Sequence, residues 1–262
     1  MDSEAGRDDA DRTAVWVVCF LDLMGYRSDL EALGDPPAAN EDEIHQRFAN
    51  VVERRRILVD GLQLYSGAVN VEVTGFSDSV FVQSAFGDYP EQPLTALNNV
   101  VLAAIGALFV NLLSGSALRG GIDIGFGLRD HGHVYTAATA RAVSLEKCAR
   151  YPRILVGPNL LATLDGLSQH DSADGEMARK IRSVFYRDLD DQQIALDFMG
   201  LASRRTYARG FTEKDVREIW SFAKKSRDEF GARGESKIAG YYERLIRYLE
   251  PRLNLWGLGK TP

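Results

Sequence analysis

The sequence predicts an α+β fold, in which a ferredoxin-like βαββαβ core is followed by a C-terminal helical appendage. Two observations support this prediction: strand and helix patterns alternate as strand, helix, strand, strand, helix, strand up to residue 126, and a long helical pattern runs from Thr212 to Leu249 and ends at Pro251. The 262 residues are enough for one large domain with an appendage. We therefore expect an acidic disordered tail at residues 1–13, a folded domain at 14–200 and a helical extension at 201–262.

Local patterns predict each element of the core. Residues 15–21 form a short β-branched and aromatic run, typical of a strand buried on both faces, and apolar residues recur at helical spacing over residues 41–65. Turn-forming residues separate two strand-like runs at 69–74 and 80–83, which indicates a hairpin. The remaining expected elements are helices at 93–113, 137–149 and 158–164 and strands at 118–126, 154–156, 183–187 and 193–198.

Composition excludes several classes of function. The chain has 31 Lys and Arg against 37 Asp and Glu, a net charge of −6, which argues against a broad cationic surface for nucleic acid. Cys19 and Cys148 are too few for a disulfide framework, so we expect two reduced core thiols. The most apolar stretch, residues 100–113, is shorter than the ~18 residues of a membrane span. We expect a cytoplasmic protein that binds neither nucleic acid nor membrane.

Two carboxylates are predicted to meet at one edge of the sheet. Asp22 ends the first strand, and Asp78 lies in the hairpin turn. Because the first and second strands of a ferredoxin-like sheet run in the same direction, both residues fall at the same edge. Each aspartate taken alone is also a common turn residue. Their convergence predicts a site for Mg²⁺ or Mn²⁺, ions that prefer oxygen ligands and are often completed by substrate phosphates.

The segment after Asp22 adds further candidates. The backbone carbonyl of Leu23 is a possible metal ligand, and the main-chain donors of residues 24–27, around Gly25, are candidates for binding phosphate at the start of a short helix. Two metal ions at such a site lower the pKa of an attacking hydroxyl and neutralise charge at phosphorus. This chemistry is sufficient for nucleotidyl transfer.

Four segments together resemble the class III nucleotide cyclases. Phe20-Leu-Asp-Leu-Met-Gly-Tyr26 resembles the family's Phe-x-Asp-Ile-x-Gly-Phe signature, and Thr74-Gly-Phe-Ser-Asp78-Ser resembles its metal-binding hairpin. The strand Leu118-Arg-Gly-Gly-Ile-Asp-Ile-Gly125 and the helix at 134–146 follow in the family's order, so the resemblance covers about residues 15–160. It implies a cyclase core in which Asp22, Leu23 and Asp78 hold two metal ions, with Phe20, Gly25 and Tyr26 at the nucleotide.

The departures from purine cyclases concern the base and the transition state. Thr74 and His133 stand where purine cyclases carry their base-reading Lys and Asp, and Ala140 and Ser144 stand near the places of a ribose-orienting Asn and a catalytic Arg. Arg141, beside the expected Asn, is a candidate for the missing positive charge, because a guanidinium can bind phosphate oxygens bidentately.

The same motifs, with Leu145-Glu146-Lys-Cys-Ala149-Arg-Tyr-Pro-Arg-Ile154, resemble the pyrimidine cyclases of bacterial Pycsar anti-phage systems. This resemblance implies a homodimer with interfacial active sites that converts UTP or CTP to the 3′,5′-cyclic monophosphate and pyrophosphate, for a separate effector protein. UTP, and therefore cUMP, is slightly preferred.

Alternatives remain open at this stage. One is a catalytically inactive cyclase-like dimer that senses a nucleotide or binds a partner, and a weaker one is another palm-like phosphotransfer enzyme. We expect His131 in solvent and Arg54, Arg55 and Arg56 on a solvated helix face or in a dimer contact. Glu146 and Lys147 are either a surface pair or, for the lysine, a phosphate contact. The C-terminal helices either cap the sheet or contribute to dimerisation.

Overall fold

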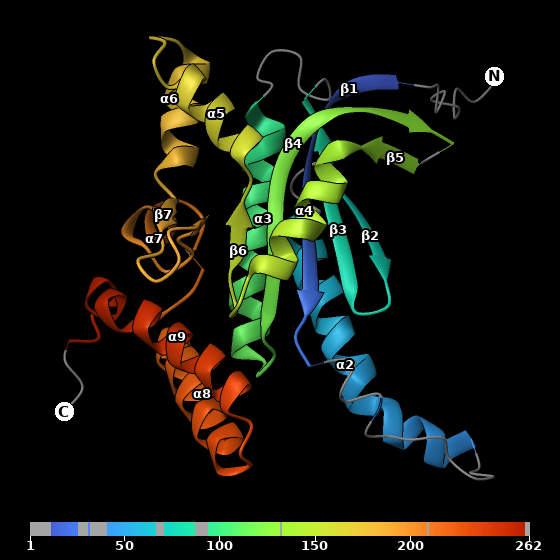
Figure 1. The fold of residues 1–262 in the computed structure, drawn as a ribbon, viewed down its shortest axis with the longest axis vertical. Helices are drawn as coiled ribbons and strands as arrows, with labels where there is room; N and C mark the ends of the chain where they lie inside the picture. The colour runs from blue at the N-terminus through green and yellow to red at the C-terminus, as the bar shows by residue number, and fades with distance from the viewer. Residues whose placement is uncertain are drawn as a thin grey trace, which may run out of the picture.

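The computed structural model describes residues 12–25, 31, 41–66, 71–86, 94–131, 133–208 and 210–259. Residues 1–11 of the expected disordered tail, and Tyr26, lie outside this part of the chain. Figure 1 shows a twisted central sheet with helices on both faces and a helical hairpin, α8 and α9, beside one end of it.

The first half of the chain builds the predicted ferredoxin-like sheet. Its strands are β1 (Arg12–Leu23), β2 (Glu72–Phe76), β3 (Ser79–Ala85) and β4 (Leu118–Asp130), in the antiparallel spatial order β2-β3-β1-β4. This order confirms the βαββαβ prediction. β1 begins earlier than expected, because Arg12 and Thr13 pair with β4 instead of belonging to a tail.

Two helices cover one face of this sheet: α2 (Glu41–Ser66) and α3 (Leu94–Leu113). Val17, Cys19 and Leu21 of β1 point into the same hydrophobic core as these helices. At 20 residues, α3 is longer than the apolar stretch that the sequence delimits, and it is the one helix in the described chain with the length and hydropathy of a membrane span. However, 78% of its apolar window is buried inside the protein, as in the core helix of a globular fold.

The opposite face carries α4 (Ala137–Cys148), which follows the short strand β5 (His133–Thr136). β5 pairs with the far end of β4 and was not expected from the sequence, because only four residues form it after the turn at His131. Glycines bring the layers close together: a Cβ on Gly121 would lie 2.3 Å from the carbonyl oxygen of Ala142 in α4, and one on Gly120 would lie 2.4 Å from that of Phe20. These two glycines therefore set the spacing of β1, β4 and α4.

The second half extends the sheet in the order β4-β6-β8-β7. Its elements are β6 (Ile154–Val156), α5 (Pro158–Leu167), α6 (Ala173–Arg182), β7 (Phe185–Arg187), β8 (Ile194–Leu196), α7 (Leu201–Thr206), α8 (Glu213–Ala232), α9 (Ser236–Leu253) and a 3-10 turn, η2 (Asn254–Trp256). The strand at 154–156 is therefore confirmed with its predicted ends. The strands at 183–187 and 193–198 and the helix opened by Pro158 are confirmed with shifted ends, and α6 was not expected.

The helical pattern predicted near the C-terminus forms a hairpin of two helices. α8 and α9 are separated at Gly234, whose φ of +77° is incompatible with a helix. Pro251 does not end α9, which continues to Leu253, because a proline in the last turn removes only one helical hydrogen bond. Phe109 of α3 stacks on Phe211 and contacts Trp256, so this part shares the main core.

The two cysteines are free thiols, and they differ in burial. Cys19 lies in the core, where burial raises the pKa of its thiol far above the usual range. Cys148 is exposed at the end of α4, which corrects the expectation that both lie in a core.

Candidate functional site

Asp22 and Asp78 meet at one edge of the sheet, as predicted. In the β1–β3 pairing, Asp22 lies directly opposite Ser79, the residue after Asp78. The backbone N–H of Leu23 donates to the carbonyl of Asp78 at 3.1 Å, which ties the end of β1 to the hairpin turn. Two residues that are 56 positions apart in the sequence are thus held together at the end of the β1–β3 ladder, and both carboxylates reach the same edge.

The environment of Asp22 disfavours its negative charge. Burial, with the side chain only 16% exposed, is the main cause that raises its pKa, and the neighbouring charge of Asp78 raises it further. Ser79 Oγ donates to Oδ1 at 2.9 Å and Arg119 donates to Oδ2 at 3.3 Å, and both contacts lower the pKa, although not enough to cancel the rise. A divalent cation between the two aspartates would relieve this repulsion, so the pair fits a metal site electrostatically.

Arg119 and Glu146 complete this acidic edge. Arg119 was missed in the sequence, and Glu146 was considered there only as part of a surface pair. Arg119 lies opposite Asp22 in the β1–β4 register and forms ion pairs with both Asp22 and Glu146 of α4. Glu146 is buried, and burial raises its pKa while the charge of Arg119 lowers it. It is therefore not half of a surface pair with Lys147, which is exposed. The only available signal was that Arg119 belongs to the strand next to β1.

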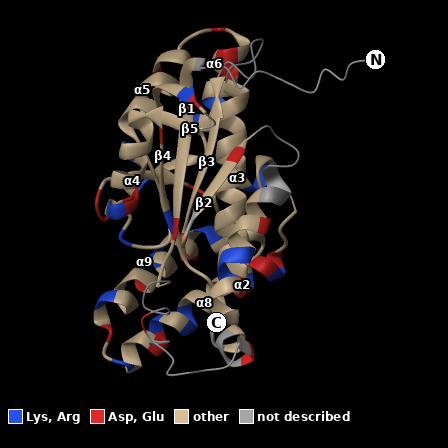
Figure 2. Cartoon of the chain, turned by 90° about the vertical axis from the view of Figure 1, so that its right-hand side faces the viewer, with Lys and Arg blue, Asp and Glu red and all other residues tan. Residues whose placement is uncertain are grey.

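Arginines of α2 hold the two loops that carry the aspartates. Arg54 donates from Nη2 to the carbonyl of Met24 at 2.8 Å, just after β1, and Arg55 donates from Nε to the carbonyl of Ser77 at 2.7 Å, just before Asp78. Arg56 instead pairs with Glu53 and Asp60 on the exposed side of the helix. Figure 2 shows basic segments of α2 near the lower ends of the strands. The solvated-face interpretation is therefore confirmed only for Arg56.

The segment after Asp22 supports only part of the expected phosphate cradle. Gly25 adopts a φ of +81°, so the chain turns where the sequence suggested. The backbone N–H of Met24 already donates to the carbonyl of Ala117 at 2.9 Å, and it is therefore not available to a phosphate. Tyr26 and Arg27 lie outside the described residues, and the carbonyl of Leu23 as a ligand stays a prediction.

Thr74 and His133 line one hollow of about 240 Å³ on the face that carries α4. Its other lining residues are Phe81, Gln83, Val134, Tyr135 and Thr139. Phe20 lies beneath it, with its ring centroid 4.8 Å from that of Phe81. The structure therefore brings together the two positions that the cyclase resemblance assigned to base recognition, whereas His131 is 94% exposed in a turn, as expected.

Arg141 has an internal partner. Its Nε donates to Oδ2 of the fully buried Asp123 at 2.5 Å, and one Nη donates to the carbonyl of Ile124 at 2.6 Å. The other carboxylate oxygen of Asp123 accepts from the backbone N–H of Leu160 at the start of α5. Arg141 thus links α4 to the sheet. Its contact with phosphate stays a prediction, and Nη1 is the nitrogen left for such a contact.

The described residues contain no group of three or more His, Cys, Asp or Glu side chains arranged to hold a metal ion. Magnesium commonly needs only one or two protein carboxylates when substrate phosphates and water complete its shell. Asp22 and Asp78 supply the two carboxylates that such a magnesium site needs, and the segments that carry them are held by Arg54 and Arg55.

No protein-family model and no curated protein matches the sequence. Three solved structures each align with 71% of the chain. They are the adenylyl cyclase CyaB from P. aeruginosa (12% identity, 93% of that chain, TM-score 0.43), the guanylyl cyclase Cya2 (13%, 90%, 0.39) and the catalytic core of a rhodopsin-guanylyl cyclase with converted specificity in complex with ATPalphaS (10%, 96%, 0.42). All three of these similar structures are nucleotide cyclases.

Proposed function

We propose that the chain is a metal-dependent nucleotide cyclase of the class III type. The observation that carries this proposal is the meeting of Asp22 and Asp78 at one sheet edge, where their mutual repulsion calls for a cation. In the proposed reaction, the 3′ hydroxyl of a nucleoside triphosphate attacks its own α-phosphorus, the bond to the β-phosphate oxygen breaks, and pyrophosphate leaves. The products are a 3′,5′-cyclic monophosphate and pyrophosphate.

The side chains of the edge have separate roles in this proposal. Asp22 and Asp78, with the carbonyl of Leu23, would hold Mn²⁺ or Mg²⁺, which when bound lowers the pKa of the attacking hydroxyl and neutralises charge at phosphorus. Arg119 keeps the Asp22 carboxylate oriented and places a positive charge beside the triphosphate. Arg54 and Arg55 fix the two loops, so that the carboxylates are positioned before substrate arrives.

We further propose that the base is a pyrimidine. The hollow lined by Thr74, His133 and Gln83 offers a hydroxyl, an imidazole and an amide, none with the fixed charge of a Lys and Asp pair. These groups can both donate and accept hydrogen bonds, so they suit uracil and cytosine alike. The resemblance to Pycsar cyclases implies UTP or CTP, and we keep a slight preference for UTP. The anti-phage role and the separate effector rest on the same resemblance, and the cytoplasmic location stays an expectation from the sequence.

The active form in this proposal is a homodimer. Phe126 and Leu128 on β4 and Tyr135 on β5 are large apolar side chains exposed by 84%, 39% and 59%. Exposed apolar residues gathered on one arm of a sheet are typical of an interaction surface. We propose that a second copy packs there, and the resemblance to cyclases implies that each active site is then shared between the two chains.

The first experiment is an assay of the purified chain with Mn²⁺ and each of ATP, GTP, CTP and UTP, with products separated by chromatography and identified by mass. We expect cUMP, or less readily cCMP, and pyrophosphate. Asp22→Asn and Asp78→Asn should each lower turnover by about 10³-fold, equivalent to ~4 kcal/mol. The control is Asp165→Asn, which changes an exposed aspartate on α5 that pairs with Arg182. Full activity in either site variant would contradict the metal assignment.

The second candidate function is an inactive cyclase-like dimer that senses a nucleotide. The observation that favours it is that Arg141 is paired with Asp123, while Ala140 and Ser144 replace the residues that stabilise the transition state in purine cyclases. Saturable Mn²⁺-dependent binding of UTP without any product would support this candidate and contradict the enzyme.

A further inference from the structure

The hollow that holds Thr74 and His133 has a single buried residue in its lining, Gln83 of β3. Gln83 is 8% exposed, whereas Thr74 and His133 are both exposed. It follows Phe81 by two residues along β3, so both side chains lie on the face of the sheet that carries α4. A buried amide is costly unless the protein or a ligand completes its hydrogen bonds.

Glu72 fixes the orientation of the Gln83 amide. Glu72 stands directly opposite Gln83 in the β2–β3 pairing, and Nε2 of Gln83 donates to Oε2 of Glu72 at 3.2 Å. A carboxylate can only accept hydrogen bonds, so the reverse orientation of the amide would place two acceptor oxygens together. The NH₂ group therefore faces Glu72, and the carbonyl oxygen Oε1 points away from it.

Glu72 is itself held by the neighbouring part of the sheet. Its Oε1 forms an ion pair with Arg129 of β4, and the guanidinium of Arg129 lies 4.9 Å from the ring centroid of the fully buried Trp16. The ion pair leaves no net charge behind the hollow, so the hollow is suited to a neutral ring more than to an ion. The same contacts keep the acceptor of Gln83 in place before a ligand arrives.

The oxygen Oε1 of Gln83 is the acceptor that remains for a ligand. Among the described residues it has no hydrogen-bond partner. The other polar groups of the lining are the hydroxyls of Thr74 and Thr139 and the imidazole of His133, each of which can donate or accept. An amide taken alone can also do both, but beside Glu72 this one has only its acceptor free. The hollow thus offers one fixed acceptor among groups that adapt to their partner.

We propose that Gln83 is a specificity-determining residue that accepts a hydrogen bond from N3–H of a uracil ring, and that Glu72 is the positioning residue that keeps its Oε1 free for this bond. Uracil carries one N–H between two carbonyl oxygens, so it matches one fixed acceptor flanked by groups that can donate. Cytosine has an unprotonated nitrogen at the same position, which would face Oε1 with a lone pair. The volume of about 240 Å³ is below that of most drug-sized sites and suits a single ring.

This inference rests on the pyrimidine site of the proposed function and gives it a structural reason to prefer UTP. It concerns the base alone, so it applies equally when the triphosphate meets the aspartates of the same chain or those of a second copy.

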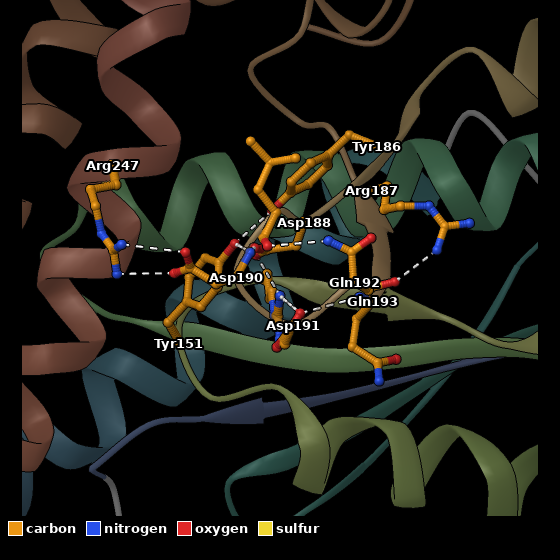
Figure 3. A network of polar contacts seen from close by, with 11 residues as sticks. Tyr151, Tyr186, Arg187, Asp188, Asp190, Asp191, Gln192, Gln193 and Arg247 are labelled. Carbon is orange, nitrogen blue, oxygen red and sulfur yellow. Dashed lines mark hydrogen bonds and ion pairs between the residues drawn. The ribbon is translucent and has the colours of Figure 1, made fainter.

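The test is isothermal titration calorimetry of the full chain with Mn²⁺ and α,β-methylene-UTP, which cannot release pyrophosphate, so that binding is measured without turnover. Three further probes are its N3-methyl form, which lacks the N–H, its C5-methyl form, which adds similar bulk but keeps the N–H, and α,β-methylene-CTP. The variants are Gln83→Leu and Glu72→Gln. The matched control is Gln193→Leu, which changes an exposed glutamine beside the β7–β8 turn on the other half of the sheet (Figure 3). Circular dichroism and thermal melting check that each variant is folded.

We expect wild type and Gln193→Leu to bind the N3-methyl and CTP probes about tenfold more weakly than α,β-methylene-UTP, and the C5-methyl probe within about threefold of it. In Gln83→Leu all four affinities should fall within about threefold of one another, because the acceptor is gone. In Glu72→Gln the amide of Gln83 can turn and offer its NH₂ group, so the preference for UTP over CTP should shrink or reverse. A merely structural role for Glu72 would weaken all four probes alike and leave their ratios unchanged.

The outcomes separate this inference from the proposed function. Unchanged discrimination against the N3-methyl and CTP probes in both variants would overturn the inference, even in a chain that makes cUMP. The same holds for tighter binding of the CTP probe by wild type, or for no binding of any probe. Discrimination that depends on Gln83, without cyclic product from any nucleotide, would support the inference and contradict the cyclase. If Gln83→Leu fails to fold, Glu72→Gln still decides, because the Glu72 side chain is 41% exposed and the change conserves its shape.

Discussion

Two pairs of aspartates in this molecule meet arginines in opposite ways. In the cluster beneath the β7–β8 turn, Arg153 contacts both Asp188 and Asp191, and its hydrogen bond and charge outweigh burial and lower the pKa of Asp191. At the Asp22 and Asp78 edge, Arg119 is shared with Glu146, and the pKa of Asp22 is raised, mainly by burial. In the first cluster, both aspartates have the same guanidinium as a partner. The second retains uncompensated negative charge, which is what a cation-binding site requires.

The largest expected effect on stability separates these two arginines. Arg153→Ala leaves Asp188 buried without its partner, so we expect a loss of about 3–5 kcal/mol in the free energy of unfolding. Arg119→Ala should cost less, because Asp22 is more exposed than Asp188 and because the raised pKa values of Asp22 and Glu146 make it easier for both to take up a proton. Urea unfolding followed by circular dichroism measures both. Equal losses would mean that the two clusters are not different in kind.

The second prediction concerns positioning by α2. Arg55→Ala frees the carbonyl of Ser77 and loosens the turn that carries Asp78, so we expect about a tenfold increase in the Mn²⁺ concentration needed for half-maximal cyclase activity. Arg56→Ala is the matched control. Arg56 is the next residue on the same helix, and its side chain pairs with Glu53 and Asp60 on the surface.

A purely structural role for Arg55 would lower the melting temperature without changing the metal requirement. Metal titrations of activity at a temperature well below both transitions therefore distinguish the two roles. An unchanged half-saturating Mn²⁺ concentration in Arg55→Ala would show that the turn is held by the sheet alone.

The sequence predicts the part of the site that depends on strand order. Asp22 and Asp78 converge because β1 and β2 run in the same direction, and that direction follows from the element order alone. Thr74 and His133 share a hollow through β5, a strand that the sequence pattern did not predict; only the cyclase resemblance linked the two positions. Arg119, Arg54 and Arg55 could not be found in this way, because their partners are set by helix packing and side-chain conformation.

The second half of the chain was less predictable for a related reason. β7 and β8 are only three residues each, and the contacts of Tyr186 form only when Tyr151 and Tyr248 of α9 pack beside these strands. Short strands give little periodicity to detect. The long α3 shows the reverse case: its apolar pattern predicted a helix correctly, but the buried part extends further than the unbroken apolar run.

The smallest expected effect is a pair of opposite pH dependences. Because the pKa of Asp22 is raised on folding, its ionised form destabilises the native state, and stability falls as pH rises from the unfolded value of 3.8 through the folded pKa. Asp22→Asn should therefore be more stable than wild type at pH 7, with the gain vanishing below about pH 4.

The pKa of Asp191 is lowered on folding, so the contribution of Asp191 to stability is present above pH 3.8 and is lost as pH falls through the folded pKa. Asp191→Asn should be less stable at pH 7, and this loss should shrink in acid. Melting temperatures of both variants and wild type from pH 3 to 8 test the signs, and the same sign for both variants would remove the electrostatic distinction between the two clusters.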